Sequence, residues 1–190
     1  MDVPIDISQV ILETSRLILR PWRENDLEDF FAYASVPGVG EMAGWKHHQS
    51  MEETKKILDA FIQEKNVFAL EEKKSNQVIG SLGLHFSLLN QEPEYQGLKL
   101  KEIGYVLSKE YWGLGLMPEA VASVISFCFH QQDLDAVTVS HYEHNLQSRR
   151  VIEKCGFSFV RQISHHSKQL DKTFIYLLLR SSFDGNSVLW

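Results

Sequence analysis

The chain has 190 residues, of which 44% are hydrophobic, so it is long enough for one well-buried core and too short for two ordinary domains. Its 25 acidic and 19 basic residues give a net charge of −6, and the absence of a basic run argues against nonspecific nucleic-acid binding. Only Cys128 and Cys155 occur, without a CxxC pair, which excludes a disulfide framework and a zinc-finger pattern.

The first half of the chain predicts a strand, two helices and a strand pair, from the spacing of apolar residues and from turn residues. Asn25 with Glu28, and Ser50 with Glu53, have the spacing of capping boxes and predict two helix starts. The expected elements are a strand at 10–20, a helix from Asn25 to Ala34, a glycine-rich loop at 35–49, a helix from Ser50 to Ile62, and a strand pair at 67–71 and 77–88.

The second half predicts alternating strands and helices that end in a strand pair. Gly156 is expected to end the last helix in a left-handed conformation. The expected elements are a loop at 89–99, a strand at 100–107, a helix opened by Pro118, a strand at 136–141, a helix at 145–154, and strands at 157–164 and 173–181. This order favours a mixed α/β or α+β fold. We expect one domain over residues 1–190, with a flexible tail at 183–190 that could also pack on a second subunit as a homodimer contact.

The glycine turn at residues 112–116 lies between a predicted strand and a predicted helix. Such a turn directs backbone N–H groups toward one point at a helix N-terminus, where phosphate binds well. The sequence Gly113-x-Gly115 lacks the third glycine of a dinucleotide fingerprint, and there is no G-x-x-x-x-G-K-[ST]. On this segment alone, anion binding and an ordinary tight turn are equally good interpretations.

Four motifs in one order make the interpretation more specific. They are Leu12-Glu-Thr-Ser-Arg-Leu-Ile-Leu-Arg20-Pro21, Glu102-Ile-Gly-Tyr105, Tyr111-Trp-Gly-Leu-Gly115 followed by Glu119-Ala120, and Asn145-x-x-Ser148 continuing to Lys154-Cys-Gly-Phe157. Over about 150 residues, the chain resembles the GNAT superfamily of acyl-CoA-dependent N-acetyltransferases, especially the branch that acetylates ribosomal-protein N-termini. The resemblance implies a twisted, mostly antiparallel mixed sheet, flanked by about four helices and splayed at the cofactor site.

The resemblance also implies where acetyl-CoA binds. Its diphosphate is expected on the backbone of the glycine turn, and its pantetheine along the preceding strand, where the N–H of Val106 would hold the oxyanion. The expected cofactor-binding residues are Val106, Leu107, Gly113, Leu114, Gly115, Leu116, Met117 and Asn145. One departure is Glu110, which stands where the family usually has Gln or Arg.

Three residues are candidates for the chemistry. Glu102 is the expected general base, and an exposed strand carboxylate is its plain alternative. Ser148 could protonate or hydrogen-bond the departing sulfur, because Ile152 stands where many family members have an acidic Tyr. Asn145 could bind pantetheine or the acceptor, although a helix cap explains it as well.

The acceptor site is expected to involve Trp45, His47, His85 and Tyr142. Trp45 and His47 lie in the glycine-rich loop, and loops over a rigid scaffold often determine specificity. His85 and Tyr142 are also weaker candidates for the general base. No histidine pair has a metal-site spacing, so no metal is expected. Without a signal sequence or a membrane-length apolar run, we expect a cytoplasmic protein that does not contact membranes.

The resemblance therefore implies an N-acetyltransferase that uses acetyl-CoA in a ternary complex and acts on a primary amine, which we expect to be a protein or peptide N-terminal α-amine in the cytoplasm. Three alternatives remain open at this stage. They are a polyamine or aminoglycoside acetyltransferase, a non-catalytic CoA-binding regulatory module, and a protein that binds a nucleotide or dinucleotide.

Overall fold

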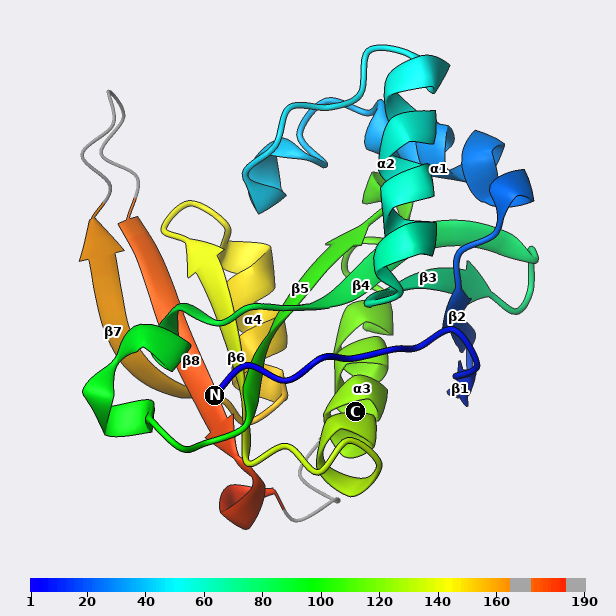
Figure 1. Ribbon diagram of the computed structural model, residues 1–190. Helices are drawn as coiled ribbons and strands as arrows, with labels where there is room; N and C mark the ends of the chain where they lie inside the picture. The colour runs from blue at the N-terminus through cyan, green and yellow to red at the C-terminus, as the bar shows by residue number, and fades with distance from the viewer. Residues whose placement is uncertain (165–171, 184–190) are drawn as a thin grey trace.

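A twisted sheet of eight strands forms the centre of the computed structural model, which describes residues 1–164 and 172–183 (Figure 1). The strand order is β1-β2-β3-β4-β5-β6-β8-β7, and only β5 and β6 pair in parallel. The strands are β1 (Leu12–Glu13), β2 (Leu17–Pro21), β3 (Val67–Glu72), β4 (Gln77–His85), β5 (Leu100–Leu107), β6 (Ala136–Tyr142), β7 (Ser158–Ser164) and β8 (Lys172–Leu179). The described residues also form four α-helices, α1 (Leu27–Ala34), α2 (Met51–Glu64), α3 (Leu116–His130) and α4 (Leu146–Lys154). The expected mixed, mostly antiparallel sheet with about four helices is confirmed.

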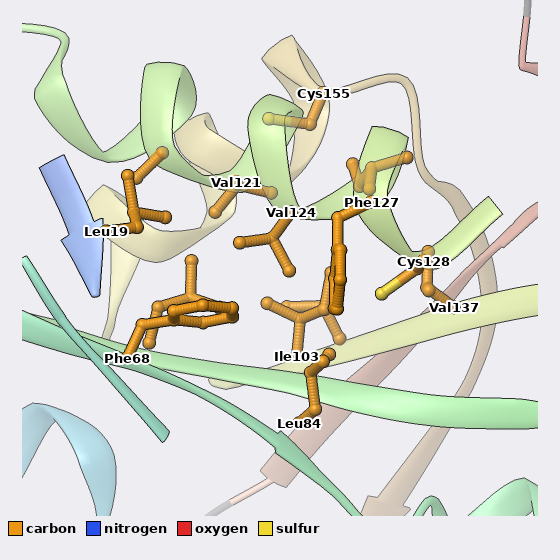
Figure 2. Packing of buried hydrophobic residues seen from close by; sticks show 14 of the residues in the cluster. Leu19, Phe68, Leu84, Ile103, Val121, Val124, Phe127, Cys128, Val137 and Cys155 are labelled. Carbon is orange, nitrogen blue, oxygen red and sulfur yellow. The ribbon is translucent and has the colours of Figure 1, made fainter. Parts of the chain in front are cut away.

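The helices cover both faces of the sheet, because strand side chains alternate between the two faces. In β3, Phe68 and Leu70 belong to the larger core that packs under α3 and α4, whereas Val67 and Ala69 belong to a second core under α1 and α2. Figure 2 shows Val121, Val124 and Phe127 of α3 directed toward side chains of the sheet. Both cores bury complete apolar side chains, so the sheet is held between two helical layers.

The predicted helix starts had mixed outcomes. Ser50 is the N-cap of α2, and its hydroxyl accepts the N–H of Glu53 at 3.2 Å, which confirms this cap. The prediction for Asn25 was wrong. A 3₁₀ turn covers Glu24–Asp26, and the carboxylate of Asp26 accepts the N–H of Arg23, so the helix begins only at Leu27.

Several predicted boundaries need smaller corrections. The strand expected at 10–20 is divided by a turn at residues 14–16, closed by the N–H of Thr14 on the carbonyl of Leu17. The strand expected to reach residue 88 ends at His85, because Ser87 caps a 3₁₀ turn. Helix α3 begins at Leu116, two residues before Pro118. Gly156 has φ of 78° after α4, as expected.

The last described residue, Phe183, packs its ring against Phe129 at the end of α3, with 5.3 Å between the ring centroids. Flexibility of the segment 183–190 stays a prediction. Residues 184–190, including Trp190, lie outside the described residues. Among the residues that the structure describes, no helix is long and apolar enough to cross a membrane.

The parallel pairing of β5 and β6 covers only part of each strand. The pairing ends at Ile103 and Val139, although β5 continues to Leu107 and β6 to Tyr142. Over the same stretch, β5 stays paired with β4 without interruption. The two strands therefore diverge in the middle of the sheet, which is the splay that the family resemblance implies.

Candidate active site

The glycine turn between β5 and α3 carries free backbone donors. Gly113 and Gly115 have φ of 78° and 76°, a region that favours glycine. The indole N–H of Trp112 donates to the carbonyl of Leu107 at 2.8 Å and fixes the turn to the end of β5. Within residues 1–164 and 172–183, the N–H groups of residues 113–117 make no hydrogen bond. The turn therefore offers consecutive donors at a helix N-terminus, an arrangement suited to phosphate.

A cavity of about 300 Å³ lies beside this turn. Most of the predicted cofactor-binding residues line it, namely Val106, Leu107, Gly113, Gly115, Leu116, Met117 and Asn145. Leu114 is not among the lining residues, and it is 57% exposed to solvent. The sequence interpretation missed Arg150 and Lys154, which line the cavity from α4 and add positive charge to its wall.

The direction of the peptide groups in β5 corrects one prediction. Within a strand, the N–H and C=O of one residue face the same neighbour, and successive residues alternate. The N–H of Ser108 donates to Ile79 in the segment of β4, and the register without a shift then turns Val106 toward β4 as well. The N–H of Val106 therefore does not face the opening. Tyr105 and Leu107 have the N–H groups that do.

Ser148 and Tyr105 form a hydrogen-bonded pair in the wall of the cavity. The hydroxyl of Tyr105 lies 2.8 Å from Oγ of Ser148 and also donates to its carbonyl oxygen at 3.3 Å. Burial raises the pKa of Tyr105, so the phenol is neutral. Ile152, one turn further along α4, is buried in the core. The sequence interpretation quoted Tyr105 within a motif and gave it no role.

Asn145 connects α4 to the loop that precedes α2. Its Oδ1 accepts the N–H of Ser148 at 3.0 Å, which makes it the N-cap of α4. Its Nδ2 donates to the carbonyl of Met42 at 2.9 Å. The oxygen and the nitrogen of the Asn145 amide therefore both have partners within the protein, which favours the helix-cap interpretation. The bond to Met42 also connects α4 to the loop that borders the cavity. Met42 lines the cavity too.

Glu102 lies on the other face of the sheet. Strand alternation places it opposite Tyr105, three residues further along β5. Its carboxylate accepts a hydrogen bond of 2.6 Å from Oγ of Ser140 on β6. Burial raises the pKa of Glu102, and the Ser140 hydrogen bond offsets part of this effect. A carboxylate with a raised pKa at the opening is suited to accept a proton.

His85 and Tyr142 lie on the same face of the sheet as Glu102, His85 directly beside it and Tyr142 four residues beyond its β6 partner Thr138. His85 is the register partner of Glu102, and its ring lies over Gly104, where an added Cβ would be 3.1 Å from Cδ2. Desolvation lowers the pKa of His85. The hydroxyl of Tyr142 lies against Gly44, where an added Cβ would be only 2.4 Å away. The glycines therefore permit close approach of both rings.

The other two predicted acceptor residues belong to the loop before α2. The ring of Trp45 packs against His48 with 5.0 Å between centroids. His47 pairs with Glu41 at 2.7 Å, and this hydrogen bond lowers the pKa of Glu41 to about 2. Among residues 1–164 and 172–183, no recorded contact joins His47 to the sheet. In the same described part of the chain, no group of three or more His, Cys, Asp or Glu side chains could hold a metal ion.

Comparison with known proteins assigns this arrangement to a family. The acetyltransferase (GNAT) domain family matches residues 16–158, well over half of the chain. The chain belongs to the GNAT acetyltransferase family. It is therefore an N-acetyltransferase, and enzymes of this family generally use acetyl-CoA and act on an amine acceptor.

Individual GNAT relatives are similar over nearly their whole length. The uncharacterized N-acetyltransferase YoaA of Bacillus subtilis is 28% identical over 178 residues, which cover 90% of this chain and 97% of the relative. A GNAT-family acetyltransferase structure from Bacillus anthracis has a TM-score of 0.79 at 20% identity, covering 90% of this chain and 99% of that one. The ribosomal-protein-S5-alanine acetyltransferase from Vibrio fischeri has a TM-score of 0.69 at 20% identity, covering 90% and 97%. At these identities, the solved structures establish the fold alone.

Proposed function

We propose that this GNAT enzyme transfers an acetyl group from acetyl-CoA to the α-amine at the N-terminus of a protein or peptide, by direct attack in a ternary complex. The observation that carries the proposal is the opening between β5 and β6, with Ser148 on its cofactor side and Glu102 on its other side. The fold shared with the Vibrio fischeri enzyme, a ribosomal-protein-S5-alanine acetyltransferase, supports a protein N-terminus as the acceptor class.

The residues around the cavity fit a CoA molecule. The free N–H groups of residues 113–117 suit a diphosphate, and Arg150 and Lys154 add complementary charge. The open edge of β5 at Tyr105 and Leu107 suits the amides of a pantetheine arm. When bound, acetyl-CoA supplies an acetyl group that is already activated as a thioester. Its recognition needs no side chain at the position of Glu110, since backbone donors carry the anion contacts.

Two side chains handle protons on opposite faces of the sheet. Glu102 accepts the proton of the attacking amine, directly or through water. The Ser148 hydroxyl, held by Tyr105, hydrogen-bonds the sulfur while negative charge develops there. Of the two open N–H groups, that of Tyr105 lies nearer the point where β5 and β6 separate and is the backbone donor positioned to stabilise an oxyanion, which leaves that of Leu107 to the pantetheine arm.

The strength of this base favours an α-amine over a lysine. At pH 7, deprotonating an α-amine of pKa near 8 costs about 1.4 kcal/mol, whereas a lysine of pKa near 10.4 costs about 4.6 kcal/mol. A single buried carboxylate such as Glu102 can therefore deprotonate an α-amine at a lower free-energy cost than a lysine side chain. The acceptor-side rings of His85 and Tyr142 and the loop that contains Trp45 are then available to contact the first residues of a peptide.

A product analysis tests this proposal. Purified protein is incubated with acetyl-CoA and three acceptor sets, namely peptides with free N-termini, N-terminally blocked peptides that contain lysine, and small amines such as a polyamine and an aminoglycoside. Mass spectrometry is expected to find acetylation on the free α-amine, and the Glu102→Gln variant is expected to lose most of it. Acetylation confined to small amines, or to blocked peptides, would refute the acceptor class. Tight CoA binding without any product would refute catalysis itself.

A further inference from the structure

An ion pair lies directly behind the glycine turn and joins two motifs that are about 100 residues apart in the sequence. Glu119 in the first turn of α3 accepts hydrogen bonds from Nε of Arg16 at 2.7 Å, from the backbone N–H of Arg16 at 2.8 Å and from Oγ of Ser15 at 3.0 Å. The hydroxyl of Thr14 donates to it as well. The Glu119 side chain is only 4% exposed, whereas that of Arg16 is 45% exposed.

The same guanidinium holds the glycine turn. Nη1 of Arg16 donates to the carbonyl oxygen of Leu114 at 2.8 Å. In a trans peptide, the C=O and the following N–H point in opposite directions. Fixing the Leu114 carbonyl toward Arg16 therefore directs the N–H of Gly115 away from Arg16. Gly115 is the N-cap of α3 and lines the cavity, so this is one of the donors available to a diphosphate.

The positive charge of Arg16 also affects the glycine turn, through the carboxylate of Glu119. Burial raises the pKa of Glu119, but the hydrogen bonds from Thr14, Arg16 and Ser15 lower it overall, so the side chain is a carboxylate. A negative charge within the first turn of α3 opposes binding of a diphosphate at that helix end. Arg16 places a positive charge 2.7 Å from this carboxylate and offsets it.

We propose that Arg16 is a positioning residue for CoA binding, which acts through Leu114 and Glu119 on the diphosphate-binding turn. The inference rests on the proposed binding of CoA at this turn. It gives a role to the Thr14–Arg16 segment, which the chemistry of acetyl transfer does not otherwise use.

The test separates the diphosphate from the rest of the cofactor. Affinities of wild type and Arg16→Gln are measured for CoA and for 3′-dephospho-CoA, and kcat/KM is measured with S-acetylpantetheine, which lacks the diphosphate. We expect Arg16→Gln to bind CoA and 3′-dephospho-CoA about five- to tenfold more weakly, by the same factor, with kcat/KM for S-acetylpantetheine unchanged. Removing the carboxylate as well, in Arg16→Gln with Glu119→Gln, is expected to restore part of the CoA affinity.

Arg180 provides a matched control at the other end of α3. It also bonds one carbonyl, that of Leu134, and one carboxylate, that of Asp133, and its side chain is 39% exposed. Arg180→Gln breaks the same kinds of contact and should leave CoA affinity unchanged. If Arg16→Gln is poorly folded, Arg16→Lys, which keeps the charge without the planar fork, is expected to weaken CoA binding about threefold.

Two results would overturn the inference while the proposed function stands. One is wild-type CoA affinity in both Arg16 variants. The other is a loss with S-acetylpantetheine as large as the loss with CoA, which would indicate general damage to the fold. A wild-type protein that binds no CoA would instead refute the proposed function, and the inference with it.

Discussion

The hydroxyl of Tyr105 on β5 lies 2.8 Å from Oγ of Ser148 on α4, so one hydrogen bond links two elements that both line the cavity. The phenol also donates to the carbonyl of Ser148 at 3.3 Å. Burial raises the pKa of Tyr105, so the group acts as a neutral hydrogen-bonding partner throughout the usual assay range. Tyr105 therefore controls where the Ser148 hydroxyl points.

Replacing Tyr105 by Phe removes this control without changing the ring. We expect kcat to fall about tenfold, the value of roughly one buried hydrogen bond, while the KM for acetyl-CoA changes less than about twofold. Steady-state kinetics at saturating peptide measure both constants. Ser148→Ala should have a similar effect, and the double variant should be little worse than either single variant.

Tyr95→Phe is the control for the Tyr105 substitution, because Tyr95 packs in a separate cluster with Leu98 and Leu89. It should leave kcat unchanged. Independent effects of Tyr105→Phe and Ser148→Ala, which multiply in the double variant, would contradict a joint role for the two hydroxyls.

Gly115 is predicted to be sensitive for two reasons. Its φ of 76° is strained for other residues, and it borders the cavity at the start of α3. Gly115→Ala should destabilise the fold by about 1 kcal/mol and weaken CoA binding, whereas Gly115→Trp should abolish binding, because its side chain starts 3.6 Å from the guanidinium of Arg16 and its bulk displaces the turn. Isothermal titration with CoA measures the affinities.

Gly97 is the matched control for Gly115. It has φ of 90° with no atom within 4 Å of an added Cβ, and it does not line the cavity. Gly97→Ala should cost about the same stability, of order 1 kcal/mol, with CoA affinity unchanged. Equal CoA affinity in wild type and Gly115→Trp would argue against an anion site at this turn.

Short-range patterns carried most of the correct predictions from sequence. The glycine turn, the Ser50 cap and the left-handed Gly156 each depend on neighbouring residues, and all are found at or near the expected positions. The Asn25 cap failed because the carboxylate of Asp26 accepts the N–H of Arg23 and pairs with the buried Arg20 at the end of β2, so the helix starts after Asp26. The capping propensity of Asn25 was overridden by the contacts of its neighbour.

The candidate site could be predicted only in part for a related reason. Strand alternation places Glu102 and Tyr105 on opposite faces, but no sequence pattern shows that Tyr105 meets Ser148. The direction of the Val106 N–H depends on which residue of β5 bonds β4, a matter of register between strands. The hydrogen bond from the amide of Asn145 to the carbonyl of Met42 depends on how a loop about 100 residues earlier folds over the site.

The buried pair of Arg20 and Asp26 is predicted to be important for stability. The guanidinium makes two hydrogen bonds of 2.8 Å to the carboxylate, and both side chains are at most 6% exposed. Arg20 also pairs with Glu71 at 2.6 Å, so Asp26→Asn leaves the buried guanidinium with one of its two carboxylates and should lower the free energy of unfolding by about 2 kcal/mol. Urea unfolding measures the change. Asp59→Asn, which breaks the exposed pair with Lys55, should change it by less than about 0.5 kcal/mol, and equal effects would contradict the prediction.

The pH dependence of the rate tests Glu102 as the base. Burial raises its pKa above the ordinary value of 4.5, and only the carboxylate can accept a proton. The rate kcat/KM should therefore fall as the pH decreases through this raised pKa. Glu102→Gln should remove this acidic limb and lower kcat/KM by about 10²-fold or more at pH 7. Profiles measured with a peptide acceptor between pH 5 and 9 show both effects.

Two further measurements test the role of Glu102, the pH profile of Ser140→Ala and the melting temperature of Glu102→Gln. The 2.6 Å hydrogen bond from Ser140 stabilises the carboxylate, so Ser140→Ala should raise the pKa further and move the acidic limb to higher pH. A raised pKa in the folded state means that ionised Glu102 destabilises the fold once the pH exceeds about 4.5. Glu102→Gln should then unfold at a higher temperature than wild type at pH 7, while it loses activity. An acidic limb that persists in Glu102→Gln would assign the base to another residue, with His85 the nearest candidate on the same face.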